Sequence, residues 1–79
     1  MRLDKYLKVS RLIKRRTVAN EACDAGRVFI NNNPAKASAN VKVGDIITIH
    51  FGNKDVNVEV LNVSETVRKE EAADLYKYV

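Results

Sequence analysis

The spacing of apolar residues changes once along this chain, and that change limits the fold more than any other feature. Between Leu3 and Ala25 the apolar residues recur at the helical period of 3.6 residues. From Val28 to Val63 they alternate at the period of two that is typical of strands. Helices followed by strands in a chain of 79 residues indicate one α+β domain over residues 1–79 with an antiparallel sheet.

Two helices are expected in the first part of the chain. The first is predicted over residues 3–13, with an apolar side and a basic side, and Leu12 is the one residue that does not fit. The second is expected to follow Thr17, whose hydroxyl can cap a helix, and to end before Gly26, which suits the left-handed position beyond a helix end. It is expected to bury its small and apolar residues, which are Val18, Ala19, Ala22, Cys23 and Ala25.

Three strands are expected after the second helix. The first covers residues 28–30 and is followed by an asparagine-rich turn at 31–34. The second covers residues 46–51, and a hairpin turn at 52–55 joins it to the third, which is predicted over residues 56–63.

The end of the chain is predicted as a third helix, over residues 68–78. The predicted order of elements is therefore two helices, three strands and one helix. Tyr6 and Phe51 are expected in the core. The apolar stripe of the third helix is expected to consist of Ala72, Leu75, Tyr76 and Val79.

Basic residues are concentrated in the first half of the chain. Residues 1–42 hold ten Lys and Arg and three Asp and Glu, whereas residues 43–79 hold four and seven. Seven basic residues lie among the first sixteen, and Asp4 is the one acid there. A domain with such an asymmetry turns one end toward a polyanion. Nucleic acid is therefore the leading class of partner.

The sequence offers little for catalysis or for metal binding. His50 and Cys23 are the one histidine and the one cysteine, which excludes a His and Cys zinc set and an internal disulfide. His50 is expected at the surface, and Asp45, which follows a glycine, is expected to cap a turn. We expect no enzyme activity, no cofactor and no metal. No apolar stretch has the length of a membrane span, and a cytoplasmic location is expected.

The candidate RNA-binding residues are basic or polar and lie in the first half of the chain. The basic side of the first helix can lie along a phosphate backbone. The arginines before the second helix lie next to its N-terminus, which favours anions. Recognition of structured RNA by shape is expected, because the aromatic residues available for stacking, Phe29 and Tyr78, are few. The candidates are Arg2, Lys5, Lys8, Arg11, Lys14, Arg15, Arg16, Thr17, Asn20, Arg27 and Lys36.

Three other interpretations of these charges are less favoured. A merely solvated helix face would not need seven basic residues among the first sixteen. A membrane-surface helix would need its apolar side, which the core of the domain requires. A DNA-binding protein would need several polar side chains on the second helix to contact base edges, and this helix offers Asn20 among small apolar residues.

The order of these residues resembles a known family. The run MRLDKYL at residues 1–7, then Arg15-Arg16-Thr17, then residues 26–31 and 41–47 resemble the S-four-type (alpha-L) RNA-binding domain over residues 1–49. The remaining residues 50–79 follow as a hairpin and a terminal helix. The resemblance implies two N-terminal helices packed on a small antiparallel sheet, with a C-terminal helix.

Within that family the chain is most similar to the stand-alone bacterial members. These are the ribosome quality-control factors and their ribosome-associated heat-shock relatives, and the compact length and the ending around residues 68–73 resemble the former more. The resemblance implies binding to large ribosomal subunits that carry a stranded peptidyl-tRNA. It also implies contacts with large-subunit rRNA and the tRNA, and support of template-free alanine tailing by a partner protein that delivers alanyl-tRNA.

The resemblance also implies roles for individual residues. Arg2 and Arg16 are expected to contact rRNA, supported by Lys5, Arg11, Arg15 and Lys36. Two departures concern the contacts. Arg15 stands where many members have serine, and Asn31-Asn32 replaces the usual Asn-Gly turn, which asparagine can form in the left-handed conformation.

The protein is expected to be a monomer.

Two alternatives to a ribosome quality-control factor stay open. The first is an RNA-binding accessory domain cut from a longer RNA-modifying enzyme, and the second is a general heat-shock-type RNA-binding protein. Met1, directly before the resemblance, favours a stand-alone chain.

Overall fold

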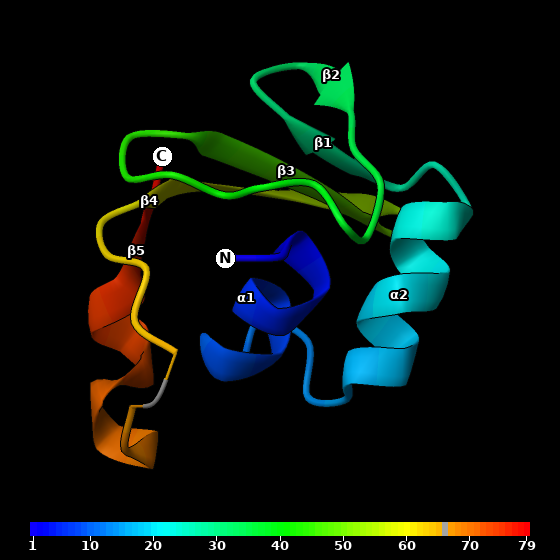
Figure 1. Ribbon diagram of the computed structural model, residues 1–79. Coiled ribbons are helices and arrows are strands. Elements are labelled where there is room, and N and C mark those ends of the chain that lie inside the picture. Colours follow the sequence, from blue (N-terminus) through cyan, green and yellow to red (C-terminus); the bar gives the residue numbers. More distant parts are fainter. Residues whose placement is uncertain (66) are drawn as a thin grey trace.

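Two helices lie against one face of a five-stranded antiparallel sheet in the computed structural model (Figure 1). They are α1 (Leu3–Val9) and α2 (Arg16–Asp24), and they pack against each other. The structure describes residues 1–65 and 67–79. The predicted α+β fold, with two N-terminal helices on an antiparallel sheet, is confirmed.

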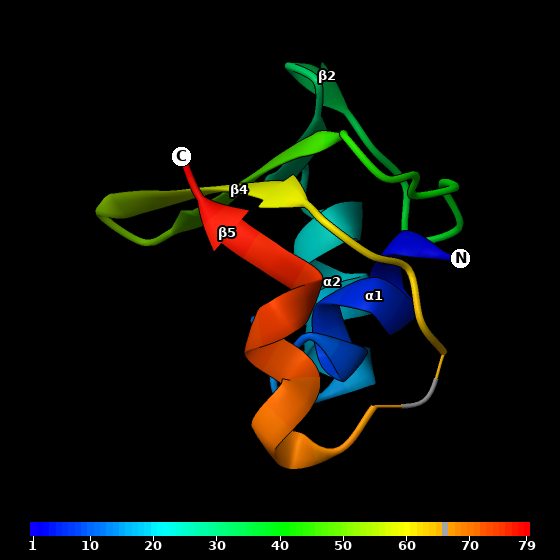
Figure 2. The same ribbon diagram turned by 90° about the vertical axis from the view of Figure 1, so that its left-hand side faces the viewer.

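The sheet has the strand order β2-β1-β3-β4-β5. A 3₁₀ helix, η1 (Lys69–Leu75), lies beside α1 at the β5 end of the sheet (Figure 2). All neighbouring strands run antiparallel. The strands are β1 (Val28–Ile30), β2 (Asn33–Pro34), β3 (Ile46–Phe51), β4 (Lys54–Val60) and β5 (Tyr76–Tyr78).

Helix α1 ends at Val9, well before the predicted end at Ile13. Arg11 adopts the left-handed conformation, with φ of 62°, which interrupts the helical hydrogen bonds. The misfit of Leu12 in the helical pattern was therefore a sign of the helix end. Ile13 is still buried, because the chain turns back toward the core after Arg11.

Helix α2 begins at Arg16, earlier than predicted. Arg15 is its N-cap and makes no side-chain cap, so Thr17 lies inside the helix and its predicted capping role is wrong. The predicted burial is half right. Ala19 and Cys23 are buried and Ala22 partly so, whereas Val18 and Ala25 are exposed.

Gly26 ends the second helix as predicted. Its φ is 74°, a conformation that glycine adopts at little cost in energy because it has no side chain. Its N–H donates to the Cys23 carbonyl at 3.0 Å, and the Arg27 N–H donates to the Ala22 carbonyl at 3.0 Å. This pair of bonds is the Schellman arrangement, which satisfies the last carbonyls of a helix.

The asparagine-rich turn is shorter than the predicted range 31–34, because Asn33 and Pro34 pair with β1 as the unpredicted strand β2 and leave two residues as the link. Asn31 and Asn32 have φ of 51° and 68°, so both take the left-handed conformation expected of them. Asp45 caps the neighbouring turn as predicted, since its carboxylate accepts the Lys42 N–H at 2.9 Å and the Asn31 side-chain amide at 3.1 Å.

The C-terminal prediction of one helix over residues 68–78 is wrong in its second part. The helical portion ends at Leu75, and Tyr76 and Tyr78 pair with β4 as strand β5. A continued helix would leave the backbone N–H and C=O groups along the open edge of β4 without partners. Pairing with β5 satisfies these groups. Of the predicted stripe, Ala72 and Leu75 are buried, Tyr76 is partly buried, and Val79 is exposed. The strand predicted over residues 56–63 is likewise shifted, to 54–60.

Tyr6 is buried as predicted, and its hydroxyl donates to the Leu75 carbonyl at 2.7 Å, which joins α1 to η1. Phe51 is not a core residue. It is 36% exposed, because it ends β3 near the hairpin tip, beyond the cover of the helices. The largest fully buried side chains are Tyr6, Leu3, Leu7, Ile47, Ile49, Leu75, Val28, Val41, Val58 and Val60.

We expect Leu7→Ala to lower the free energy of unfolding by about 2–5 kcal/mol, because it leaves a cavity in a close-packed core. Urea denaturation followed by circular dichroism measures this. Lys8→Ala, at the exposed neighbouring position, should change it by less than about 0.5 kcal/mol. Equal decreases in both variants would contradict the burial of Leu7.

Candidate RNA-binding surface

A buried carboxylate gathers two arginines at the start of α1. Asp4 has a side chain that is 3% exposed. Arg2 donates to it through Nε at 3.2 Å and through Nη2 at 3.3 Å. The Nε atom of Arg16, on α2, lies 3.4 Å from the second oxygen of the same carboxylate. Residues that are distant in sequence are thus held at one point of the surface.

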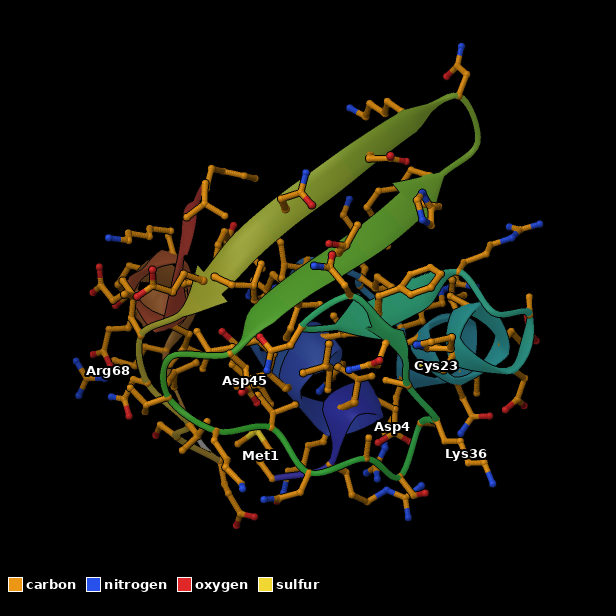
Figure 3. The ribbon with its side chains drawn as sticks, turned by 90° about the horizontal axis from the view of Figure 1, so that it is seen from above. Met1, Asp4, Cys23, Lys36, Asp45 and Arg68 are labelled. Carbon is orange, nitrogen blue, oxygen red and sulfur yellow. The ribbon has the colours of Figure 1, made fainter. Side chains whose placement is uncertain are left out.

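The loop between β2 and β3 fixes the position of Asp4. The Leu3 N–H donates to the Ala39 carbonyl at 2.8 Å, and the Asp4 N–H donates to the Ala37 carbonyl at 3.1 Å. Loop carbonyls therefore satisfy the first N–H groups of α1, which has no side-chain cap. Lys36, which directly precedes Ala37, lies on the same side of the molecule as Asp4 (Figure 3).

Both guanidinium groups remain available to a ligand. The side chains of Arg2 and Arg16 are 52% and 50% exposed. One carboxylate offsets only one of the two positive charges, and each guanidinium has more N–H groups than Asp4 uses. Arginine can bind phosphate oxygens through two parallel hydrogen bonds, and a fixed orientation favours such a contact. The arrangement is suited to a phosphate backbone.

Two polar candidates of α2 lie beside this pair. Thr17 and Asn20 line a surface hollow of about 430 Å³ together with Asp4, Arg16 and Glu21. The Asn20 side-chain amide donates to Asp4 at 3.4 Å, so it helps to hold the carboxylate. The structure therefore brings five candidates to one face, which are Arg2, Arg16, Thr17, Asn20 and Lys36.

Other basic candidates line a second hollow, which shares no lining residue with the first. Lys8, Arg11 and Lys14 line a hollow of about 390 Å³ with Glu65. Lys5 adjoins this group, since its Nζ lies 3.6 Å from a Glu65 oxygen. The left-handed Arg11 thus stands at the edge of a hollow lined by three basic side chains.

Two candidates, Arg15 and Arg27, line neither of these hollows. Arg15 is the exposed N-cap of α2. Arg27 lines a different hollow, with Phe51 and His50, beyond the C-terminal end of α2. The ring of Phe29 meets that of His50 edge-on at 5.1 Å, and is partly buried.

The part that Asp4 plays was not evident from the sequence, in which it stands out only as the one acid among the N-terminal cations. Burial of this carboxyl raises its pKa, but the hydrogen bonds from Arg2, Asn20 and the Lys5 N–H and the charge of Arg16 outweigh burial. The pKa of Asp4 is therefore lower than its ordinary value of 3.8. Only the position of Asp4 between two basic residues in sequence hinted at this.

The described residues hold no cluster of possible metal ligands, and their cysteine is buried. Within residues 1–65 and 67–79, no three His, Cys, Asp or Glu side chains are grouped as metal ligands. Burial raises the pKa of the Cys23 thiol to about 11, so it stays protonated at neutral pH. In the same part of the chain, no helix is long and apolar enough to cross a membrane.

Comparison with known proteins decides the family. The S4 domain model matches residues 1–47. The chain belongs to the S4 domain family. It is 64% identical over 77 residues to a Halalkalibacterium halodurans protein named RQC P-site tRNA stabilizing factor, covering 98% of this chain and 88% of that protein. The Bacillus subtilis protein of the same name is 60% identical over 76 residues, with 96% and 88% covered.

A solved structure agrees with this S4 fold. Trimeric heat shock protein 15 from Vibrio cholerae superposes with a TM-score of 0.92 at 32% identity, over 100% of this chain and 81% of that one. The family resemblance inferred from the sequence is confirmed.

We expect Asp4→Asn to lower the free energy of unfolding by about 1–3 kcal/mol at pH 7, because it weakens charged hydrogen bonds at a buried site. The folded pKa of Asp4 is lowered, so its contribution is present above pH 3.8 and is lost as the pH falls through the folded pKa. The difference between wild type and variant should shrink correspondingly in acid. Urea denaturation at several pH values measures it.

Glu65→Gln is the matched control, because it removes an exposed carboxylate that also pairs with a basic residue. It should change stability little at any pH. If the difference between wild type and Asp4→Asn does not shrink as the pH is lowered into acid, the Asp4 charge does not stabilise the fold.

Proposed function

We propose that this protein is a non-catalytic RNA-binding factor of bacterial ribosome-associated quality control. It binds, in the cytoplasm, to large ribosomal subunits obstructed by peptidyl-tRNA and supports C-terminal alanine tailing of the stalled chain. Its partners are large-subunit rRNA, the peptidyl-tRNA and a protein that delivers alanyl-tRNA. The single observation that carries the proposal is the pair Arg2 and Arg16, held by one buried carboxylate on the surface of an S4 domain.

The names of the relatives support the tRNA and quality-control part of the proposal. Proteins named RQC P-site tRNA stabilizing factor match nearly the whole chain at 64% and 60% identity. Identity at this level over nearly the whole chain supports the same role for this protein. The likeness to heat shock protein 15 favours a second candidate, a general ribosome-associated RNA-binding role, at the lower identity of 32%.

The mechanism that we propose is rigid presentation of charge. Helix α1, helix α2 and the loop before β3 converge on Asp4, so the arginines are oriented before RNA arrives. Pre-orientation lowers the entropy that binding must remove. Phosphate contacts then supply affinity, and the fixed shape of the surface selects folded RNA. Bound in this way, the protein holds the tRNA without breaking or forming a covalent bond.

We expect Arg2→Ala and Arg16→Ala each to weaken binding to purified obstructed large subunits, because each removes a cation that neutralises a phosphate. Sedimentation through a sucrose gradient over a range of salt concentrations measures this. The slope of log affinity against log salt should become shallower by about 0.7–0.9 for each phosphate that the variant no longer neutralises. The doubly substituted protein should also fail to support alanine tailing.

Arg68→Ala is the matched control, since Arg68 is an exposed arginine far from Asp4 (Figure 3). It should bind as the wild type does. Circular dichroism should show all variants folded. If Arg2→Ala and Arg16→Ala bind with wild-type affinity and salt slope, the proposed surface is wrong. If the wild type binds these subunits but tailing is independent of it, the heat-shock-type role is the better one.

A further inference from the structure

A largely apolar hollow at the back of α2, on the side that faces β3, is lined by none of the five candidates gathered near Asp4. This hollow of about 430 Å³ lies between α2 and the β3–β4 hairpin. Val18 and Phe51, two large side chains predicted to be buried, are 46% and 36% exposed there. The apolar side chains that line it are Ile13, Val18, Ala22, Ala25, Ile49 and Phe51.

The apolar stripe of α2 is wider than the core requires. Ala19 and Cys23 face the core, whereas Val18, Ala22 and Ala25 follow the spacing of an adjoining side of the helix and line the hollow. Small residues on that side leave the space open. An exposed apolar hollow with polar groups at its rim is typical of an interaction site.

The hollow is lined almost entirely by other residues than the hollow beside Arg16. The hairpin extends from the sheet in the direction opposite to Asp4 and Lys36 (Figure 3). The hollow beside Arg16 and the hollow beside Phe51 share only Glu21 among the residues that line them. A ligand can therefore occupy the back of α2 while RNA occupies the other side.

The rim charges indicate the chemistry of the occupant. Glu21 and Arg27 stand at the rim, and neither has an ion-pair partner within residues 1–65 and 67–79. The imidazole of His50, which also lines the hollow, contacts the carboxylate of Asp55. One carboxylate and one guanidinium give the rim no excess of positive charge. A phosphate backbone gains nothing from such a rim, whereas a protein segment with both signs of charge complements it.

We propose that this hollow docks a protein of the obstructed large-subunit complex. The docked segment inserts an apolar side chain between Val18 and Phe51, places a lysine or arginine against Glu21, and places an aspartate or glutamate against Arg27. This inference rests on the proposed function for the complex in which docking occurs. It assigns Arg27 to protein contact rather than to RNA.

Site-specific photo-crosslinking tests the proposal. The exposed residue Ala25 is replaced by p-benzoylphenylalanine, and the protein is bound to purified obstructed large subunits and irradiated. The expected adduct contains protein and survives ribonuclease. Adding Val18→Asp should lower its yield about tenfold, as truncation of a central interface residue does. Val43→Asp, at an exposed valine outside the hollow, should leave the yield unchanged.

Glu21→Lys is a second variant, and it should also lower the yield of the protein adduct. Its result does not depend on whether the fold tolerates an aspartate at position 18. An adduct that ribonuclease destroys, no adduct from bound protein, or a protein adduct that neither variant reduces would each overturn the docking proposal. In all three cases the protein is still bound to the subunits, so the proposed function survives. If the wild type does not bind the subunits at all, the proposed function fails and this inference fails with it.

Discussion

The carboxylate of Asp4 is the group on which the functional surface depends. It accepts hydrogen bonds from Arg2 and Asn20, and it lies within ion-pair distance of Arg16. Because it is buried, water competes with these bonds less than it would at the surface. Two like charges that would otherwise repel each other are thereby held side by side. The same charge pattern without Asp4 would be a set of mobile surface cations.

The position of that carboxylate depends in turn on a long-range backbone contact. The carbonyl groups of Ala37 and Ala39 accept the first N–H groups of α1. The loop that provides them follows β2 and the left-handed Asn31-Asn32 turn. The position of Asp4 therefore depends on the course of the chain after that turn. The loop after β2 thus connects the sheet to the candidate RNA-binding surface.

Sequence patterns predicted the elements better than their ends. The periodicity identified two helices and the central hairpin, and Gly26 marked a helix end by its conformational freedom. The end of α1 was wrong because Arg11 leaves the helix without a glycine or proline to show it. The last strand was missed because Tyr76 and Val79 fit a helical stripe with Ala72 and Leu75, and only the open edge of β4 makes Tyr76–Tyr78 a strand.

The sequence by itself determined the order of helices and strands, the concentration of positive charge near the N-terminus and the family resemblance, because these follow from residue types and their spacing. The tertiary structure alone decided how the cations are grouped. It joined Arg2 to Arg16 through Asp4, placed Lys8, Arg11 and Lys14 around a second hollow, and placed Arg27 in the lining of a third. Grouping of this kind depends on which distant segments pack together, and packing is a property of the whole core rather than of any local pattern.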